Sequence, residues 1–238
     1  MRPDRVRRRL AELRTRGYNF DAASRHDHPA AAGWHVDDLR QVLPTESPGP
    51  PAAGGSWEIA RRLMLGYEFA DPSIVQADYD PNEPLEGRTM LLELRFHGLL
   101  RFHAGTRVRA VFDDERRLDA RRARVWGWTY GTLEGHLEQG EMTWEVWKWL
   151  DSGDVEFRIH AYSRPAPDLN PILRLGFRLF GRREQLAFMH GTLRRMQGLT
   201  EAALHGAPMQ RSADALTARG AADATRAHRR LARRLKTR

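Results

Sequence analysis

The strongest constraint on the fold is a change of hydrophobic period between Ile74 and Arg164. Apolar and polar residues alternate over this stretch, and turns rich in Gly, Pro and Asp divide it into short runs. Alternation at period two is typical of half-buried strands. The pattern predicts an antiparallel meander, with strands near 74 to 79, 89 to 96, 106 to 113, 123 to 131, 141 to 150 and 154 to 163.

The last two of these strands form the clearest predicted hairpin. Their connection, Asp151-Ser-Gly-Asp154, has turn composition, and the second arm alternates strictly from Val155 to Tyr162. One face of that arm carries Val155, Phe157, Ile159 and Ala161. The other face carries Glu156, Arg158, His160 and Tyr162.

Three further elements flank the meander. An extended segment is expected over 34 to 43, and the loop 44 to 55, rich in Pro and Gly, separates it from a helix over 56 to 65 that Ser56 can cap. After Pro165 and Pro167, Asn170 can cap a long helix. The apolar stripe of that helix is Ile172, Leu175, Leu179, Leu186, Met189 and Leu193.

The order of elements predicts an α+β, helix-grip fold. A curved antiparallel sheet of about seven strands has a concave face that needs covering, and one long C-terminal amphipathic helix can cover it while leaving a hollow. We expect three regions: a basic N-terminal leader (1–30), a helix-grip domain (31–200) and a basic, mobile or marginally helical tail (201–238).

Composition excludes several classes of protein. With no cysteine, the chain has no disulfide framework, thiol nucleophile or thiolate zinc site. No stretch approaches the about 18 apolar residues of a membrane span, and MRPDRVRRRLAELRTRG lacks the apolar centre of a secretory signal. We expect a cytoplasmic protein with no membrane span.

The net charge of +8 comes almost entirely from arginines, which are concentrated at the two ends of the chain. Neither end interleaves the aromatic residues that stack on bases. Solvated helical or frayed termini are therefore the favoured structure. We expect nucleic-acid contact only as a weak interaction of these termini.

One motif carries a family resemblance. It runs from Tyr130-Gly-Thr-Leu through Gly135-His136 and Gly140-Glu141, and continues after the hairpin as Ser163-Arg-Pro165. This combination resembles the domain of unknown function nineteen-ninety family, well over 123 to 166 and loosely over 34 to 198. The resemblance implies a small intracellular protein without an established reaction. Element order also suggests kinship with the START-like helix-grip superfamily, whose members bind lipids, sterols or other apolar ligands.

The predicted strands supply an aromatic lining for an interior cavity. Such residues can equally fill a solid core, and both interpretations stand. Trp147 and Trp149 lie on the opposite face, so some aromatic surface must face a ligand, the N-terminal segment or a partner. The expected ligand-binding residues are Trp126, Trp128, Tyr130, Trp144, Phe157, Arg158 and His160.

The connection after Tyr130 brings His136, Glu138 and Glu141 to the rim of the sheet, and His136 and Glu141 are the candidate catalytic residues. The alternative is a connection whose polar side chains satisfy the backbone, because the spacing matches no established metal motif. We expect no metal and no cofactor. Templates for standard hydrolases, kinases and dehydrogenases are absent.

These observations favour a protein that binds a small, apolar or lipid-like ligand in an aromatic-lined cavity. Tyr130, His136 or Arg158 would orient the polar end of the ligand. Two alternatives remain open. One is an enzyme of the cyclase, isomerase or hydrolase kind that uses the same pocket, and the other is a protein or nucleic-acid interaction module.

Overall fold

The computed structural model describes residues 1–21, 33–96, 100–167 and 181–208. Within these ranges the strands form one antiparallel sheet of seven, in the order β1-β7-β6-β5-β4-β3-β2. The strands are β1 (His35–Leu43), β2 (Val75–Asp78), β3 (Thr89–Phe96), β4 (Leu100–Leu118), β5 (Arg121–Thr132), β6 (Glu138–Trp149) and β7 (Val155–Pro165). The helices are α1 (Pro3–Arg14), α2 (Ser56–Leu65) and α4 (Arg182–Leu204).

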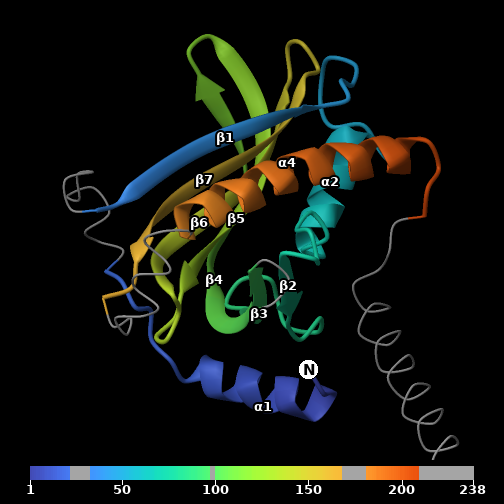
Figure 1. Cartoon of the computed structure of the whole chain (residues 1–238). Coiled ribbons are helices and arrows are strands. Elements are labelled where there is room, and N and C mark those ends of the chain that lie inside the picture. Colours follow the sequence, from blue (N-terminus) through green and yellow to red (C-terminus); the bar gives the residue numbers. More distant parts are fainter. Residues whose placement is uncertain (22–32, 97–99, 168–180, 209–238) are drawn as a thin grey trace, which may run out of the picture.

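The concave face of this sheet is covered by α4, with α2 beside it (Figure 1). The α+β prediction of a curved antiparallel sheet that grips a C-terminal helix is therefore confirmed. The helix start expected near Asn170 and most of the tail after 201 lie outside the described residues. The face of β7 predicted to be apolar does enter the core, since Val155, Phe157, Ile159 and Ala161 are all fully buried.

The expected strands and helix match the structure closely, with two differences. β4 runs from Leu100 to Leu118, well beyond the expected 106 to 113, and its outer part, which shows no apolar alternation, pairs with the start of β5 up to Leu118 and Arg121. Ser56 does not cap α2. Gly55 occupies the N-cap position, and Ser56 is the first helical residue.

The loop 44 to 55 is held by a buried ion pair. The ammonium group of Lys148 is inaccessible to solvent and lies 2.6 Å from Glu46 Oε2, while it also donates to the carbonyl of Ser47 at 2.9 Å. The same carboxylate accepts from the backbone N–H groups of Ala52 and Trp57. This pair anchors the proline-rich loop, and through it the start of α2, to the C-terminal end of β6.

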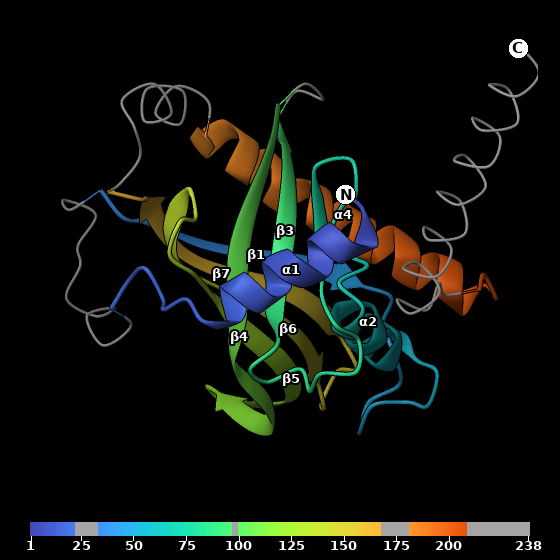
Figure 2. The same ribbon diagram turned by 90° about the horizontal axis from the view of Figure 1, so that it is seen from below.

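The convex face is covered in part by the N-terminal segment. Figure 2 shows α1 crossing β3 and β4 on the outside of the sheet. Leu10 and Leu13 of α1 pack against Leu91 and Leu133. A side chain at Gly105 of β4 would overlap Leu13, so the helix lies close to the strand. The first part of the expected basic leader is thus a helix that packs on the sheet. The expected end of the leader, at residue 30, lies outside the described residues.

Trp147 and Trp149 lie on the convex face, as the alternation predicts, and they are only 6% and 4% exposed. Arginine side chains cover both rings. The Arg158 guanidinium carbon lies 4.0 Å from the centre of the Trp147 ring, and that of Arg121 lies 4.1 Å from the centre of the Trp149 ring. The surface offered to a partner is therefore mainly guanidinium. None of the described helices is long and apolar enough to cross a membrane.

Candidate functional site

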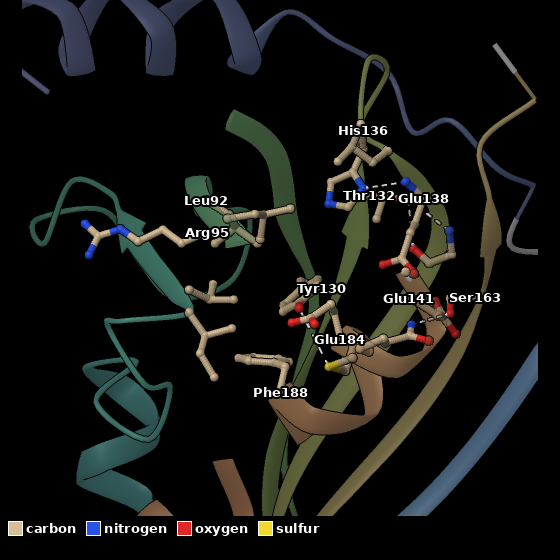
Figure 3. A pocket seen from close by; sticks show the side chains of 18 of the residues that line it. Leu92, Arg95, Tyr130, Thr132, His136, Glu138, Glu141, Ser163, Glu184 and Phe188 are labelled. Carbon is tan, nitrogen blue, oxygen red and sulfur yellow. Dashed lines mark hydrogen bonds between the residues drawn. The ribbon is translucent and has the colours of Figure 1, made fainter. Parts of the chain in front are cut away.

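A cavity of about 100 Å³ lies between β3, β5, β6 and the first turns of α4 (Figure 3). Its apolar wall is built by side chains that alternate toward the concave face and by one residue of α4. These are Ile74, Val75, Leu92, Leu94, Met142 and Phe188. Polar groups gather at the other side, and they include Thr132, His136, Glu138, Ser163, Glu184 and Gln185. The cavity thus has one apolar and one polar side.

The family-like motif lines this cavity. Tyr130, Thr132, His136, Gly140, Glu141 and Ser163 all contribute to its wall. Gly140 has a φ of 139°, and a Cβ there would overlap the carbonyl oxygen of Tyr162. Only glycine fits such a close backbone approach, so this position explains the glycine of the Gly-Glu pair.

His136 is held at the rim as a neutral imidazole. The ring is 7% exposed, and its Nδ1 accepts a hydrogen bond of 2.9 Å from the backbone N–H of Glu138. Burial lowers the pKa of His136 to about 4. The Nε2 atom therefore carries the proton, and the ring adds no charge to the cavity near neutral pH.

Glu138, the first residue of β6, has the most unusual carboxyl group in the cavity. Burial raises its pKa to about 7; the nearby Arg182 guanidinium opposes this shift and the Asp37 carboxylate adds to it. The carboxyl group consequently changes charge near neutral pH.

The arginine that acts electrostatically on Glu138 is paired with another carboxylate. Both terminal nitrogens of Arg182 bind Asp37 of β1, one of them at 2.6 Å. Arg182 also donates to Gln185 at 2.8 Å, and Gln185 donates to Ser163 at 2.7 Å. This chain of bonds fastens the start of α4 to β1 and β7 beside the cavity.

Glu141 has a different environment from His136. Its carboxylate pairs with Arg109 at 2.5 Å, and the Arg109 guanidinium stacks over the rings of Tyr18 and Phe20. Arg109 is the extra residue of a bulge in β4, and a bulge redirects a side chain in this way. Thus His136 bonds to the backbone of Glu138, while Glu141 bonds across the sheet to Arg109. The structure therefore joins His136 to Glu138 at the rim, and the carboxylate of Glu141 faces the N-terminal segment.

Asn19 holds the rim from outside. Its side-chain amide donates to the backbone carbonyl of Glu138 at 2.9 Å, and its Oδ1 accepts from the Thr132 hydroxyl at 2.6 Å. The Thr132 oxygen in turn accepts from the Gly140 N–H at 2.9 Å. One amide side chain therefore ties the end of β5 to the start of β6, where the polar groups of the cavity lie.

Two tyrosines stand where the cavity meets the aromatic core. The Tyr130 hydroxyl lies 3.7 Å from Met142 Sδ, and the Tyr67 ring packs against Trp128 and Trp144. Burial raises the pKa of both tyrosines. They therefore remain protonated and offer hydrogen-bond donors at neutral pH.

The other expected ligand-binding residues are placed elsewhere. Trp126, Trp128, Trp144 and Phe157 lie in the concave core against α2 and α4; in the described part of the chain, Trp144 and Phe157 stack 6.2 Å apart with no exposure. Arg158 pairs with Glu156 at 2.7 Å on the convex face. His160 shares that face, because it alternates with Ile159. Of the expected set, Tyr130 lines the cavity.

Several cavity residues had no distinguishing signal in the sequence. Leu92 and Leu94 read as ordinary strand residues, and Glu184 and Gln185 as the polar face of a helix. The leucines come from the sheet and the polar residues from α4, and they line one cavity only because α4 packs across the sheet. Among the described residues no three His, Asp or Glu side chains are grouped to hold a metal ion.

No curated protein matches the sequence. Solved structures are similar at low identity. The protein TTHA0849 from Thermus thermophilus is 9% identical, covering 71% of this chain and 99% of that one, with a TM-score of 0.44. Human STARD10 is 8% identical, covering 79% and 83%, with a TM-score of 0.38. The di-domain ARO/CYC StfQ from the steffimycin biosynthetic pathway is 14% identical, covering 76% of this chain and 55% of StfQ, with a TM-score of 0.45.

A family model described as "Domain of unknown function (DUF1990)" matches residues 18–193. The match includes the whole sheet, the motif around the cavity and the first half of α4. It begins at Tyr18, within the segment that covers Arg109 and Glu141. The chain therefore belongs to the DUF1990 family.

Proposed function

We propose that the cavity binds a small, largely apolar molecule whose single polar group faces the rim formed by His136, Glu138 and Ser163. The observation that carries this proposal is the coincidence of the family motif with the polar side of a cavity whose other side is aliphatic and aromatic. A buried polar cluster costs stability unless its groups are satisfied. A bound polar group that satisfies them would offset this cost.

The volume of the cavity limits the size of the ligand. Sites for drug-sized molecules span roughly 300 to 1,000 Å³, whereas this cavity has about 100 Å³. An engineered closed cavity of about 150 Å³ holds benzene. The present cavity is smaller but open on one side, so the largest expected ligand is a single ring or a short branched chain that extends partly out of the opening. Burial of ~200 Å² of apolar surface contributes about 5 kcal/mol before association costs. Affinity for such a fragment alone is therefore weak, and polar contacts must supply the rest.

The proposal is tested with a cavity-filling variant and a matched control. Leu94→Phe places a larger ring in the cavity, and Leu199→Phe makes the same change at a partly buried position of α4 outside the cavity wall. Chemical-shift changes on titration with benzyl alcohol should appear around the cavity in the wild type and in Leu199→Phe, and be lost in Leu94→Phe. The proposal fails if no ring-sized alcohol, amine or acid shifts cavity resonances at millimolar concentration, or if Leu94→Phe binds as well as the wild type.

Acid–base catalysis in the same cavity is the second candidate. It is favoured by the carboxyl group of Glu138, whose pKa of about 7 suits either proton donation or proton acceptance at neutral pH. In this second candidate function, Glu138 replaces Glu141 as the acid–base partner of His136. Mass spectrometry of the bound molecule after incubation in heavy water tests it, because proton transfer to and from carbon, isomerisation included, replaces hydrogen by deuterium and raises the mass. A molecule that takes up no deuterium and keeps its mass argues for binding without conversion. A cytoplasmic location stays a prediction.

A further inference from the structure

Among the described residues that line the cavity, acidic side chains outnumber basic ones. Glu138 from β6 and Glu184 from α4 both line it, and His136 beside them is a neutral ring. Asp37 of β1 lies close enough to affect Glu138 electrostatically. A molecule that enters this region meets carboxylates from strands on one side and a helix on the other.

In the part of the chain that the structure describes, the arginines around the cavity are already paired with acidic side chains. Arg182 binds Asp37 through both terminal nitrogens, and Arg109 binds Glu141 at 2.5 Å. Arg95, which lines the cavity, binds Glu93 at 2.8 Å. An anionic ligand would have to take one of these guanidinium groups from its present carboxylate. For Arg182 and Arg109 that exchange leaves a buried acid without its partner, whereas Glu93 would keep Arg101 at 3.4 Å.

Glu138 differs from these paired acids. Within the described ranges its carboxylate has no cation at ion-pair distance, and Arg182 acts on it only through its longer-range field. A desolvated carboxylate without a paired cation is an energetically costly arrangement. A positively charged group delivered by the ligand removes that cost, while a second negative charge increases it.

On these grounds we infer that the ligand carries a protonated amine or a comparable cationic group, which binds the Glu138 carboxylate while its apolar part lies against Leu92, Leu94 and Phe188. This inference rests on the proposed function, because it assigns the charge of the molecule that the cavity takes.

The pH dependence of ligand binding follows from the titratable and charged groups around Glu138. These groups are His136, Asp37, Arg182 and Glu184. Burial, opposed by Arg182 and reinforced by Asp37, raises the pKa of Glu138 to about 7, so the fraction of charged carboxylate increases as the pH rises through that value. Burial lowers the pKa of His136 to about 4, which keeps the imidazole neutral over the same range. A simple amine stays protonated until about pH 10. Binding of an amine should strengthen between pH 6 and pH 8, and its uptake should release protons from Glu138.

The test compares three molecules of one shape: benzylamine, benzyl alcohol and benzoate. Calorimetric or NMR titration at pH 8 should give benzylamine a dissociation constant about tenfold lower than that of benzoate, the range of one charge-assisted hydrogen bond. The preference should decrease at pH 6. In Glu138→Gln the amine and the acid should bind within about threefold of each other.

The possible outcomes separate the two proposals. Benzoate binding more tightly than benzylamine at pH 8 overturns the cationic assignment and leaves the cavity as a binding site. The absence of binding by all three molecules overturns the proposed function itself. If Glu138→Gln fails to fold, the pH dependence of benzylamine binding to the wild type decides, since affinity that is flat from pH 6 to pH 8 contradicts a role for Glu138.

Discussion

Replacing Glu138 by glutamine keeps the shape of the side chain and removes its ionisation. In the folded protein burial raises the pKa of this carboxyl from 4.5 to about 7. Because the folded value lies above the unfolded one, the stabilisation from holding the proton is fully present below about pH 4.5 and is lost as pH rises through 7. A tenfold difference in proton affinity is worth about 1.36 kcal/mol, so the full loss is about 3 kcal/mol. The side chain retains partial solvent contact, so this figure is an upper limit.

The assay is urea unfolding followed by tryptophan fluorescence, for which the chain has seven reporters. Wild type and Glu138→Gln should have similar free energies of unfolding at pH 4.5. At pH 8.5 the variant should be more stable by between 1 and about 3 kcal/mol. His136 is present in both proteins, so its own titration cancels from the difference. Glu115→Gln, on the exposed end of β4, is the control and should change stability by the same small amount at both pH values. An equal effect of Glu138→Gln at pH 4.5 and pH 8.5 would refute the reasoning.

Three other substitutions test the supports of the site. Gly140→Ala forces a side chain against the Tyr162 carbonyl at a φ of 139°, and should cost roughly 2 to 4 kcal/mol in urea unfolding; a neutral effect would contradict the close approach. Lys148→Met leaves Glu46 buried without its cation and should cost about 3 to 5 kcal/mol, whereas an unchanged midpoint would mean that the pair adds nothing. Asn19→Ala removes the bonds to Thr132 and to the Glu138 carbonyl; a loss of about 1 to 2 kcal/mol together with weaker benzylamine binding is expected, and retained affinity would argue against a positioning role.

The fold could be predicted because its signal is periodic and local. Alternation from Val155 to Tyr162 assigned each side chain of β7 to the correct face, and the helix over 56 to 65 was placed at the residues where α2 occurs. The extent of β4 in the β4–β5 hairpin could not be predicted, because its outer residues 114 to 118 are mainly charged and exposed. Charged residues on two exposed faces show no apolar period.

The site was predicted only in part, since it depends on where elements meet. The motif identified Tyr130 and His136, which do line the cavity, and it brought Glu138 to the rim. It also suggested Glu141 as the partner of His136. The bulge at Arg109, which gives Glu141 a partner under Tyr18, depends on a strand far along the chain and leaves no local trace. Arg182 and its bond to Asp37 likewise follow from the docking of α4 on β1.

The prediction that Trp126, Trp128 and Trp144 line a cavity rested on aromatic alternation. The same alternation occurs in strands that pack into a solid core. Trp128 and Trp144 are almost fully buried among other rings and the side chains of α2 and α4. Whether such residues line a cavity or fill a solid core depends on the volume that remains between the packed helices and strands. That volume is set by residues from several elements and has no signal within one strand.

The N-terminal segment rests on three positions that lack side chains. A Cβ on Gly105 would overlap Leu13, one on Gly131 would touch Tyr18 and Phe20, and one on Gly135 would overlap Arg16. Each contact joins residues that are far apart in sequence. A substitution at one of the two positions therefore requires a compensating substitution at the other. We therefore expect relatives that carry larger residues at these glycines to have lost or rerouted the segment before Tyr18, and paired variation at these sites would record that history.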